Sequence, residues 1–161
     1  CILLLDVLEH LNEPEKFVYN LRAQSRGKCP KIIVSVPNIS FFIMRIQLLF
    51  GRFSYGIRGI LDLGHRRLFT YSTIQDIFAQ AGFKIIEVKG VPAPYPLAIG
   101  KNTLSKILLG INQLLIRLSP RLFSYQIFLT TTPLPTMHEL LKVNLESSQV
   151  RIDQLTQPGK R

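Results

Sequence analysis

The sequence has little of what builds disulfide frameworks or zinc sites, since its 161 residues include only two cysteines, Cys1 and Cys29. Their spacing matches neither pattern, so we expect a reducing, cytoplasmic setting. Long apolar runs are also missing, and none approaches the about 20 residues that cross a bilayer. The apolar start reaches Asp6 without a basic leader. We therefore predict neither a membrane span nor a secretory signal.

Acidic residues are scarce: 10 Asp and Glu stand against 20 Lys and Arg, which gives a net charge of +10. Such an excess suits nucleic acid, anionic lipid or an acidic substrate. The basic residues are scattered, however, and do not alternate with aromatic residues on a strand. A solvated basic surface is the simpler interpretation, and nucleic-acid binding is not expected. The composition, 47% hydrophobic and 19% charged, is typical of a globular domain.

Short apolar runs alternate with helical patterns along the chain. Strands are expected at residues 1–6, 31–36, 83–91 and 125–131, and helices at 12–24, 73–81 and 103–118, with a further apolar segment at 39–50. Asn12 is the expected N-cap of the first helix, and Thr70 or Ser72 that of the second. This alternation predicts an α/β fold in which helices cover the faces of a sheet.

The first predicted strand begins at residue 1 and would have an unpaired edge. This suggests that the sheet continues upstream and that the domain is truncated. We assign residues 1–131 to one domain, with a lid-like insertion at 39–70. Residues 132–161 are polar, with weak helical character near 138–146, and we expect a partly disordered tail.

Polar residues that can do chemistry follow the first strand directly. Asp6, Glu9 and His10 lie just past its carboxyl end, where open α/β sheets bind ligands. If the chain turns helical there, their spacing places all three on one helix face. Two carboxylates and an imidazole can hold a divalent ion or exchange protons. The alternative is structural and simpler: Asp6 and Glu9 also fit the pattern of a helix capping box.

Two further segments reach the same edge of the predicted sheet. His65 lies in the Gly-containing loop 64–70, where a histidine is either solvated or directed at the strand ends. Asn38 ends the second strand, and its side chain either touches a substrate or caps the next helix. Spacing alone leaves both alternatives open.

These segments together resemble class I S-adenosylmethionine (SAM) methyltransferases. The run Asp6-Val7-Leu8-Glu9-His10-Leu11 is similar to that family's fourth-strand motif, and Val34-Ser35-Val36-Pro37-Asn38 is similar to its fifth. Gly64-His65-Arg66-Arg67-Leu68-Phe69-Thr70 resembles its Gly-His-x-Arg-x-Phe-Thr stretch, and Gln80-Ala81-Gly82-Phe83 its Ala-Gly-Phe helix end. The resemblance covers residues 1–131 and is closest to the bacterial branch that includes ubiquinone-type O-methyltransferases.

The resemblance implies a Rossmann-like, mostly parallel sheet with helices on both faces, of which this chain holds about strands four to seven. The family's glycine-rich cofactor loop and its ribose-binding acid have no counterpart here, so we expect this chain alone to bind SAM poorly. In some relatives, including small-RNA 2′-O-methyltransferases, a Glu-x-x-Glu-His stretch and a later His bind a divalent ion. The site residues implied are Leu5, Asp6 and Val7 for the cofactor; Asp6, Glu9, His10 and His65 for Mg²⁺; His10, His65 and Glu9 for catalysis; and Asn38 and Arg66 for the substrate.

The expected function is methyl transfer from SAM to an oxygen of a small-molecule acceptor, either lipid-like or a sugar intermediate. Residues 39–58 and 97–123 combine apolar faces with basic residues, a pattern typical of helices that lie on anionic membranes and equally of core helices with basic flanks. Peripheral contact with the inner face of the membrane is therefore an additional expectation. The alternative function is a non-catalytic, degenerate domain that docks on a membrane or a partner protein. The sequence indicates no oligomeric state.

Overall fold

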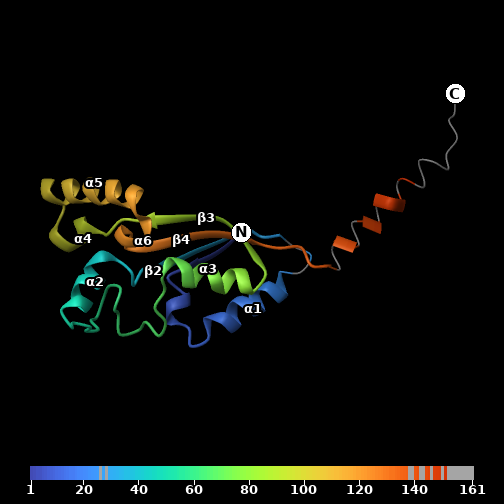
Figure 1. The fold of residues 1–161 in the computed structure, drawn as a ribbon, viewed down its shortest axis with the longest axis horizontal. Helices are drawn as coiled ribbons and strands as arrows, with labels where there is room; N and C mark the ends of the chain where they lie inside the picture. The colour runs from blue at the N-terminus through green and yellow to red at the C-terminus, as the bar shows by residue number, and fades with distance from the viewer. Residues whose placement is uncertain are drawn as a thin grey trace, which may run out of the picture.

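The computed structural model describes residues 1–25, 27, 29–137, 140, 141, 144, 145, 147–149 and 151. Its described part holds one sheet of four strands, in the order β1 (Ile2–Leu5), β2 (Ile32–Pro37), β4 (Gln126–Pro133) and β3 (Phe83–Val91) (Figure 1). β1 is parallel to β2, and β4 is antiparallel to both of its neighbours. Three strands therefore share one direction. This confirms the predicted α/β fold with a Rossmann-like, mostly parallel sheet.

Helices α1 (Pro14–Gln24) and α3 (Tyr71–Gln80) cover one face of this sheet (Figure 1). Val18 of α1 and Phe78 of α3 are fully buried in the same core as Leu4 of β1. Since side chains alternate along a strand, Leu3 and Leu5 of β1 lie on the opposite face, where they are 59% and 51% exposed. The described helices thus leave that face of β1 uncovered.

The boundaries of several elements match the sequence patterns. β3 has the bounds that were predicted, α5 (Thr103–Leu118) does too, and Thr70 caps α3 by accepting a hydrogen bond from the Thr73 N–H. The predicted Asn12 cap is wrong, because its side-chain oxygen accepts from the Arg66 guanidinium and α1 begins at Pro14 after an N-cap without a side-chain bond.

Segment 39–70, the predicted lid-like insertion, contains a helix and part of a second core. α2 (Phe42–Leu49) forms within residues 39–50, and Ile60 of the following loop is buried in a second core with Phe41 and Ala93. β4 continues through Pro133, two residues past the predicted domain boundary at 131. The predictions of a weak helix near 138–146 and of a disordered tail fall largely outside the described residues.

Three helices follow β3 and form the end of the molecule opposite α1: α4 (Tyr95–Ile99), α5 and α6 (Pro120–Phe123) (Figure 1). α5 has the predicted helical stripe, but its two fully buried residues are polar, and half-buried leucine and isoleucine residues surround them. Ser105 and Asn112 are its buried residues. The apolar side chains that face solvent instead are Leu104, Ile107, Ile111, Leu114 and Leu118. Among the described residues, no helix is long and apolar enough to cross a membrane.

Candidate functional site: a carboxylate and two imidazoles at the end of β1

Three of the predicted site residues lie together beyond the carboxyl end of β1. Glu9 and His10 belong to a short 3-10 helix, η1 (Leu8–His10), and His65 comes from the loop that precedes α3. One potential ligand atom from each of the three lies within 4.8 Å of the others. The rings of His10 and His65 stand edge to face, with centroids 4.9 Å apart. The structure thus brings together residues that are more than fifty positions apart in the sequence.

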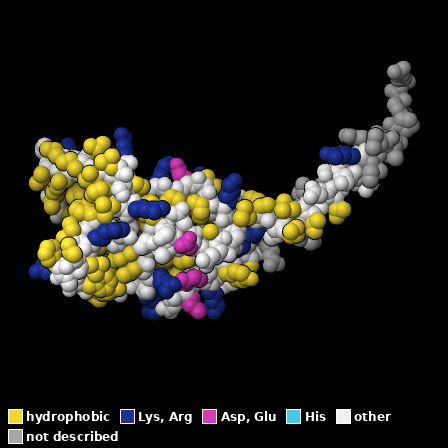
Figure 2. Space-filling view, in the orientation of Figure 1, with side chains coloured by type: hydrophobic (Ala, Val, Ile, Leu, Met, Phe, Trp, Pro, Cys, Tyr) yellow, Lys and Arg dark blue, Asp and Glu magenta, His cyan; other side chains and the backbone are white. Residues whose placement is uncertain are grey.

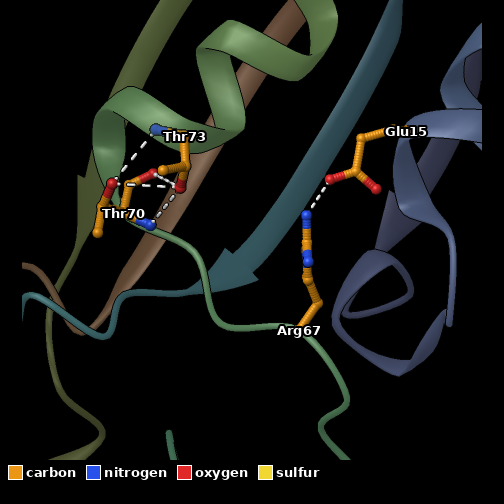
Figure 3. Close-up of polar contacts among 4 residues, drawn as sticks. All are labelled: Glu15, Arg67, Thr70 and Thr73. Carbon is orange, nitrogen blue, oxygen red and sulfur yellow. Dashed lines mark hydrogen bonds and ion pairs between the residues drawn. The ribbon is translucent and has the colours of Figure 1, made fainter.

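The backbone of Glu9 holds the His65 loop in place. The Glu9 carbonyl oxygen accepts hydrogen bonds from the N–H groups of Arg66 and Arg67, at 2.7 and 3.1 Å. The Arg67 side chain forms an ion pair with Glu15 of α1 (Figure 3). These contacts fix His65 relative to η1 without using the Glu9 carboxylate.

Each imidazole is oriented by a backbone carbonyl. Nδ1 of His10 lies 3.0 Å from the Gly64 carbonyl oxygen, and Nδ1 of His65 lies 2.9 Å from that of Ile60. Because a carbonyl can only accept, each Nδ1 carries the hydrogen, and the lone pair of the neutral ring is on Nε2. A histidine that donates one ring N–H to a carbonyl and presents the other nitrogen is arranged as metal-binding histidines are.

The Glu9 carboxylate occupies an unusual environment. The residue is 1% exposed, and neither carboxylate oxygen has a hydrogen-bond partner among the described residues. Burial raises the pKa of this carboxyl, and the negative charge of Asp6 adds to the effect, while the residue's own backbone N–H and the two imidazoles oppose it. A buried carboxylate without partners is costly, and a bound cation would remove that cost. These three side chains therefore fit a divalent metal ion.

Asp6 lies in the same cavity but is turned toward other partners. Its backbone is in the left-handed region, with φ of 53°. Its carboxylate accepts hydrogen bonds from Ser35 Oγ at 2.9 Å and from the Gln126 side-chain nitrogen at 3.0 Å. The capping-box alternative for Asp6 and Glu9 is wrong, since η1 has Val7 as its N-cap and no side-chain cap bond. Asp6 is not part of the ligand cluster, so its predicted role as a metal ligand is not supported by its position.

The other predicted residues occupy different surroundings. Asn38 is fully buried, and its amide donates to the carbonyl oxygens of Arg121 and Ser124, at 3.1 and 2.8 Å, so it acts as a structural link rather than facing a cavity. Arg66 is exposed and directs its guanidinium at Asn12. Leu5 is half exposed at the end of β1, and contact between the cofactor and Leu5, Asp6 or Val7 stays a prediction.

Two cavities of about 280 Å³ each adjoin at this site. The first contains the Glu9, His10 and His65 side chains, and the second lies beneath α2. Arg58, Gly59 and Tyr125 line both. The sequence patterns did not single out Arg58 or Tyr125. Tyr125 could have been identified from its position at the start of the last predicted strand, because that strand begins at the edge of the sheet where β1 and β2 end.

Comparisons with known proteins give fold-level similarities at low identity. No protein-family model and no curated protein matches the sequence. Similar solved structures include the crystal structure of the small RNA methyltransferase HEN1, with 14% identity and a TM-score of 0.49, covering 83% of this chain and 14% of that one. A SAM-dependent methyltransferase from Archaeoglobus fulgidus gives 19% identity and a TM-score of 0.46, covering 82% of this chain and 57% of that one.

A third similar structure is a methyltransferase of Bacillus halodurans C-125 whose function is described as putative. It shows 15% identity and a TM-score of 0.42, covering 83% of this chain and 68% of that one. This chain therefore spans less than two thirds of the length of the first two structures.

Proposed function

We propose that this chain is the C-terminal part of a class I SAM-dependent methyltransferase that methylates an oxygen of a small-molecule acceptor. The observation that carries the proposal is the buried Glu9 carboxylate, which has no hydrogen-bond partner in the described part of the chain and lies beside two imidazoles whose Nδ1 atoms are bonded to carbonyl oxygens. The position of this cluster at the carboxyl end of β1, where open α/β sheets bind ligands, supports it. The motif resemblance at residues 6–11, 34–38 and 64–70 supports the choice of SAM as cofactor.

Each residue has a defined role in this proposal. Glu9, His10 and His65 would hold the divalent ion, which when bound supplies positive charge that lowers the pKa of the acceptor hydroxyl. In a metal-free variant of the mechanism, Nε2 of His10 or His65 accepts the hydroxyl proton. Leu5, Asp6 and Val7 would contact SAM, which when bound supplies an electrophilic methyl group. The remaining task of the protein is to align the two reactants.

The cavity beneath α2 supports an acceptor with an apolar part. Its lining includes Phe41, Ile43, Met44 and Leu61, and it joins the polar cavity at Arg58, Gly59 and Tyr125. An acceptor that places its hydroxyl beside Glu9 and an apolar group under α2 would occupy both. This favours the lipid-like acceptor over the sugar intermediate, because a sugar would leave the apolar cavity unfilled.

Calorimetric titration of SAM, with and without Mg²⁺, tests the proposal. The protein used is the full-length one, of which this chain is the proposed C-terminal part. No SAM binding under either condition would refute methyl transfer and favour the non-catalytic alternative. Mn²⁺ serves as a probe of the metal site, and Glu9→Gln should weaken its binding at least about tenfold, since a neutral amide replaces a charged ligand. Glu13→Gln is the matched control, because Glu13 is an exposed carboxylate four positions away. Equal Mn²⁺ affinity of both variants would contradict the metal site.

A further inference from the structure

Helix α5 presents an apolar stripe to solvent, and we call this stripe the α5 face. It comprises Leu104, Ile107, Ile111, Leu114 and Leu118, whose exposed fractions range from 50% to 76%. Their spacing of three and four residues places them on one side of a helix about 24 Å long. The opposite side packs on the molecule through Ser105, Asn112 and half-buried leucine and isoleucine residues; Asn112 accepts from the Ala93 N–H and donates to the Phe123 carbonyl, both at 2.9 Å. The α5 face is therefore directed outward by specific hydrogen bonds.

The apolar surface continues beyond α5. Leu97 of α4 is 84% exposed, and Leu49 and Phe50 at the end of α2 are 82% and 74% exposed. α2 adjoins this part of the fold through Phe42, whose ring lies 5.7 Å from that of Phe123 in α6. Figure 2 shows hydrophobic side chains gathered over the end of the molecule that carries α2, α4 and α5. A patch this extended marks an interaction surface.

The charges of the same region have a single sign. None of the acidic residues of the sequence lies in 39–61 or 92–125. Seven basic residues do, and among the described residues none of them forms an ion pair: Arg45, Arg52, Arg58, Lys101, Lys106, Arg117 and Arg121. In Figure 2 the visible acidic side chains lie over the middle of the molecule, away from this end. The surface is thus apolar with an unneutralised cationic border.

We propose that the α5 face lies on an anionic membrane surface. Helices that rest in a membrane interface combine an apolar side with Lys and Arg, and each basic residue near anionic headgroups strengthens the binding. A second copy of this chain fits the same surface less well. Pairing two α5 faces would bring Lys106 and Arg117 near their counterparts, and α4–α6 offer no acidic residue to neutralise them.

Co-sedimentation of the intact protein with vesicles tests this proposal. We expect binding to vesicles of equal parts phosphatidylcholine and phosphatidylglycerol, little binding to phosphatidylcholine alone, and release at high ionic strength. The double substitution of Ile107→Gln and Leu114→Gln should reduce partitioning about tenfold. Tyr19→Gln, which removes an exposed aromatic residue from α1, should leave it unchanged. Neither change alters a residue of the Glu9 cluster. The test of membrane binding is therefore independent of the test of methyl transfer.

A charge variant makes the test independent of the apolar substitutions. Lys106→Glu with Arg117→Glu should also lower binding at least about tenfold, whereas Lys84→Glu on β3 should not. Unchanged far-ultraviolet circular dichroism would show that the variants are folded. Absence of binding to the anionic vesicles at low ionic strength overturns the proposal. A second result would also overturn it: the wild type is a dimer in sedimentation equilibrium, the Ile107→Gln, Leu114→Gln variant is a monomer, and neither binds the vesicles.

Discussion

Replacing Asn112 by alanine tests the orientation in which α5 packs on the rest of the molecule. Asn112 is 2% exposed and lies in the middle of a helix in which five leucine and isoleucine residues face solvent and the other four are half-buried. Its side chain joins two separate segments, since it accepts from the backbone N–H of Ala93 and donates to the backbone carbonyl of Phe123. Alanine removes both hydrogen bonds while leaving a good helix former in place.

The magnitude follows from what each lost bond leaves behind. The Ala93 N–H is buried and would have no partner, at a cost of about 2 kcal/mol, whereas the Phe123 carbonyl is only partly buried and would lose about 1 kcal/mol. The higher helix propensity of alanine returns about 0.6 kcal/mol. We therefore expect Asn112→Ala to lower the free energy of unfolding by about 2–3 kcal/mol.

Urea denaturation followed by far-ultraviolet circular dichroism measures this change. Gln113→Ala is the matched control, because Gln113 is the next residue along the helix and is exposed, so its free energy of unfolding should change by no more than about 0.5 kcal/mol. If Asn112→Ala were as stable as the wild type, or more stable, Asn112 would be solvated. The apolar stripe would then face the body of the protein, and the basis of the membrane proposal would be lost.

Three further predictions test other parts of the fold. A Cβ at Gly90 would lie 1.8 Å from Ser124 Oγ, so Gly90→Ala should lower the free energy of unfolding by about 2–4 kcal/mol in urea denaturation, and Ser124→Gly in the same chain should restore part of it. Thr70→Ala should lower it by about 1 kcal/mol, since the Thr73 N–H loses its acceptor; no change in urea would exclude this cap. Burial raises the pKa of Tyr71, so the folded state resists its ionisation, and the free energy of unfolding should fall as pH rises above 10.0. Denaturation at several alkaline pH values should show a smaller fall for Tyr71→Phe than for the wild type. An equal fall in both would contradict the burial of Tyr71.

The sequence predicted where elements lie better than which way they face. β3 and α5 have the expected bounds because period-two and helical patterns are local properties of the chain. The stripe on α5 was also correct as a pattern, but a pattern cannot show which side of the helix packs inward. That depends on Asn112 finding partners at Ala93 and Phe123, which belong to other segments.

The residues of the site show the same difference between what a local pattern predicts and what tertiary contacts decide. Glu9 and His10 follow a strand end, and His65 lies in a loop with a distinctive motif, so spacing and resemblance sufficed to group them. Asp6 differs because its left-handed backbone turns its carboxylate toward Ser35 and Gln126, and no spacing rule contains that information. Tertiary contacts, rather than local patterns, decided which carboxylate faces the two imidazoles.

Glu9 has two separate roles, one through its backbone and one through its side chain. Its carbonyl oxygen holds the loop of His65 by accepting from Arg66 and Arg67, whereas its carboxylate faces the imidazoles. Glu9→Gln alters only the second role, so the loop should keep its place and His10 should stay near His65. A loss of Mn²⁺ binding in that variant would then report on the missing negative charge. The same substitution should raise the stability of the metal-free protein, because it removes a buried carboxylate that has no hydrogen-bond partner among the residues described.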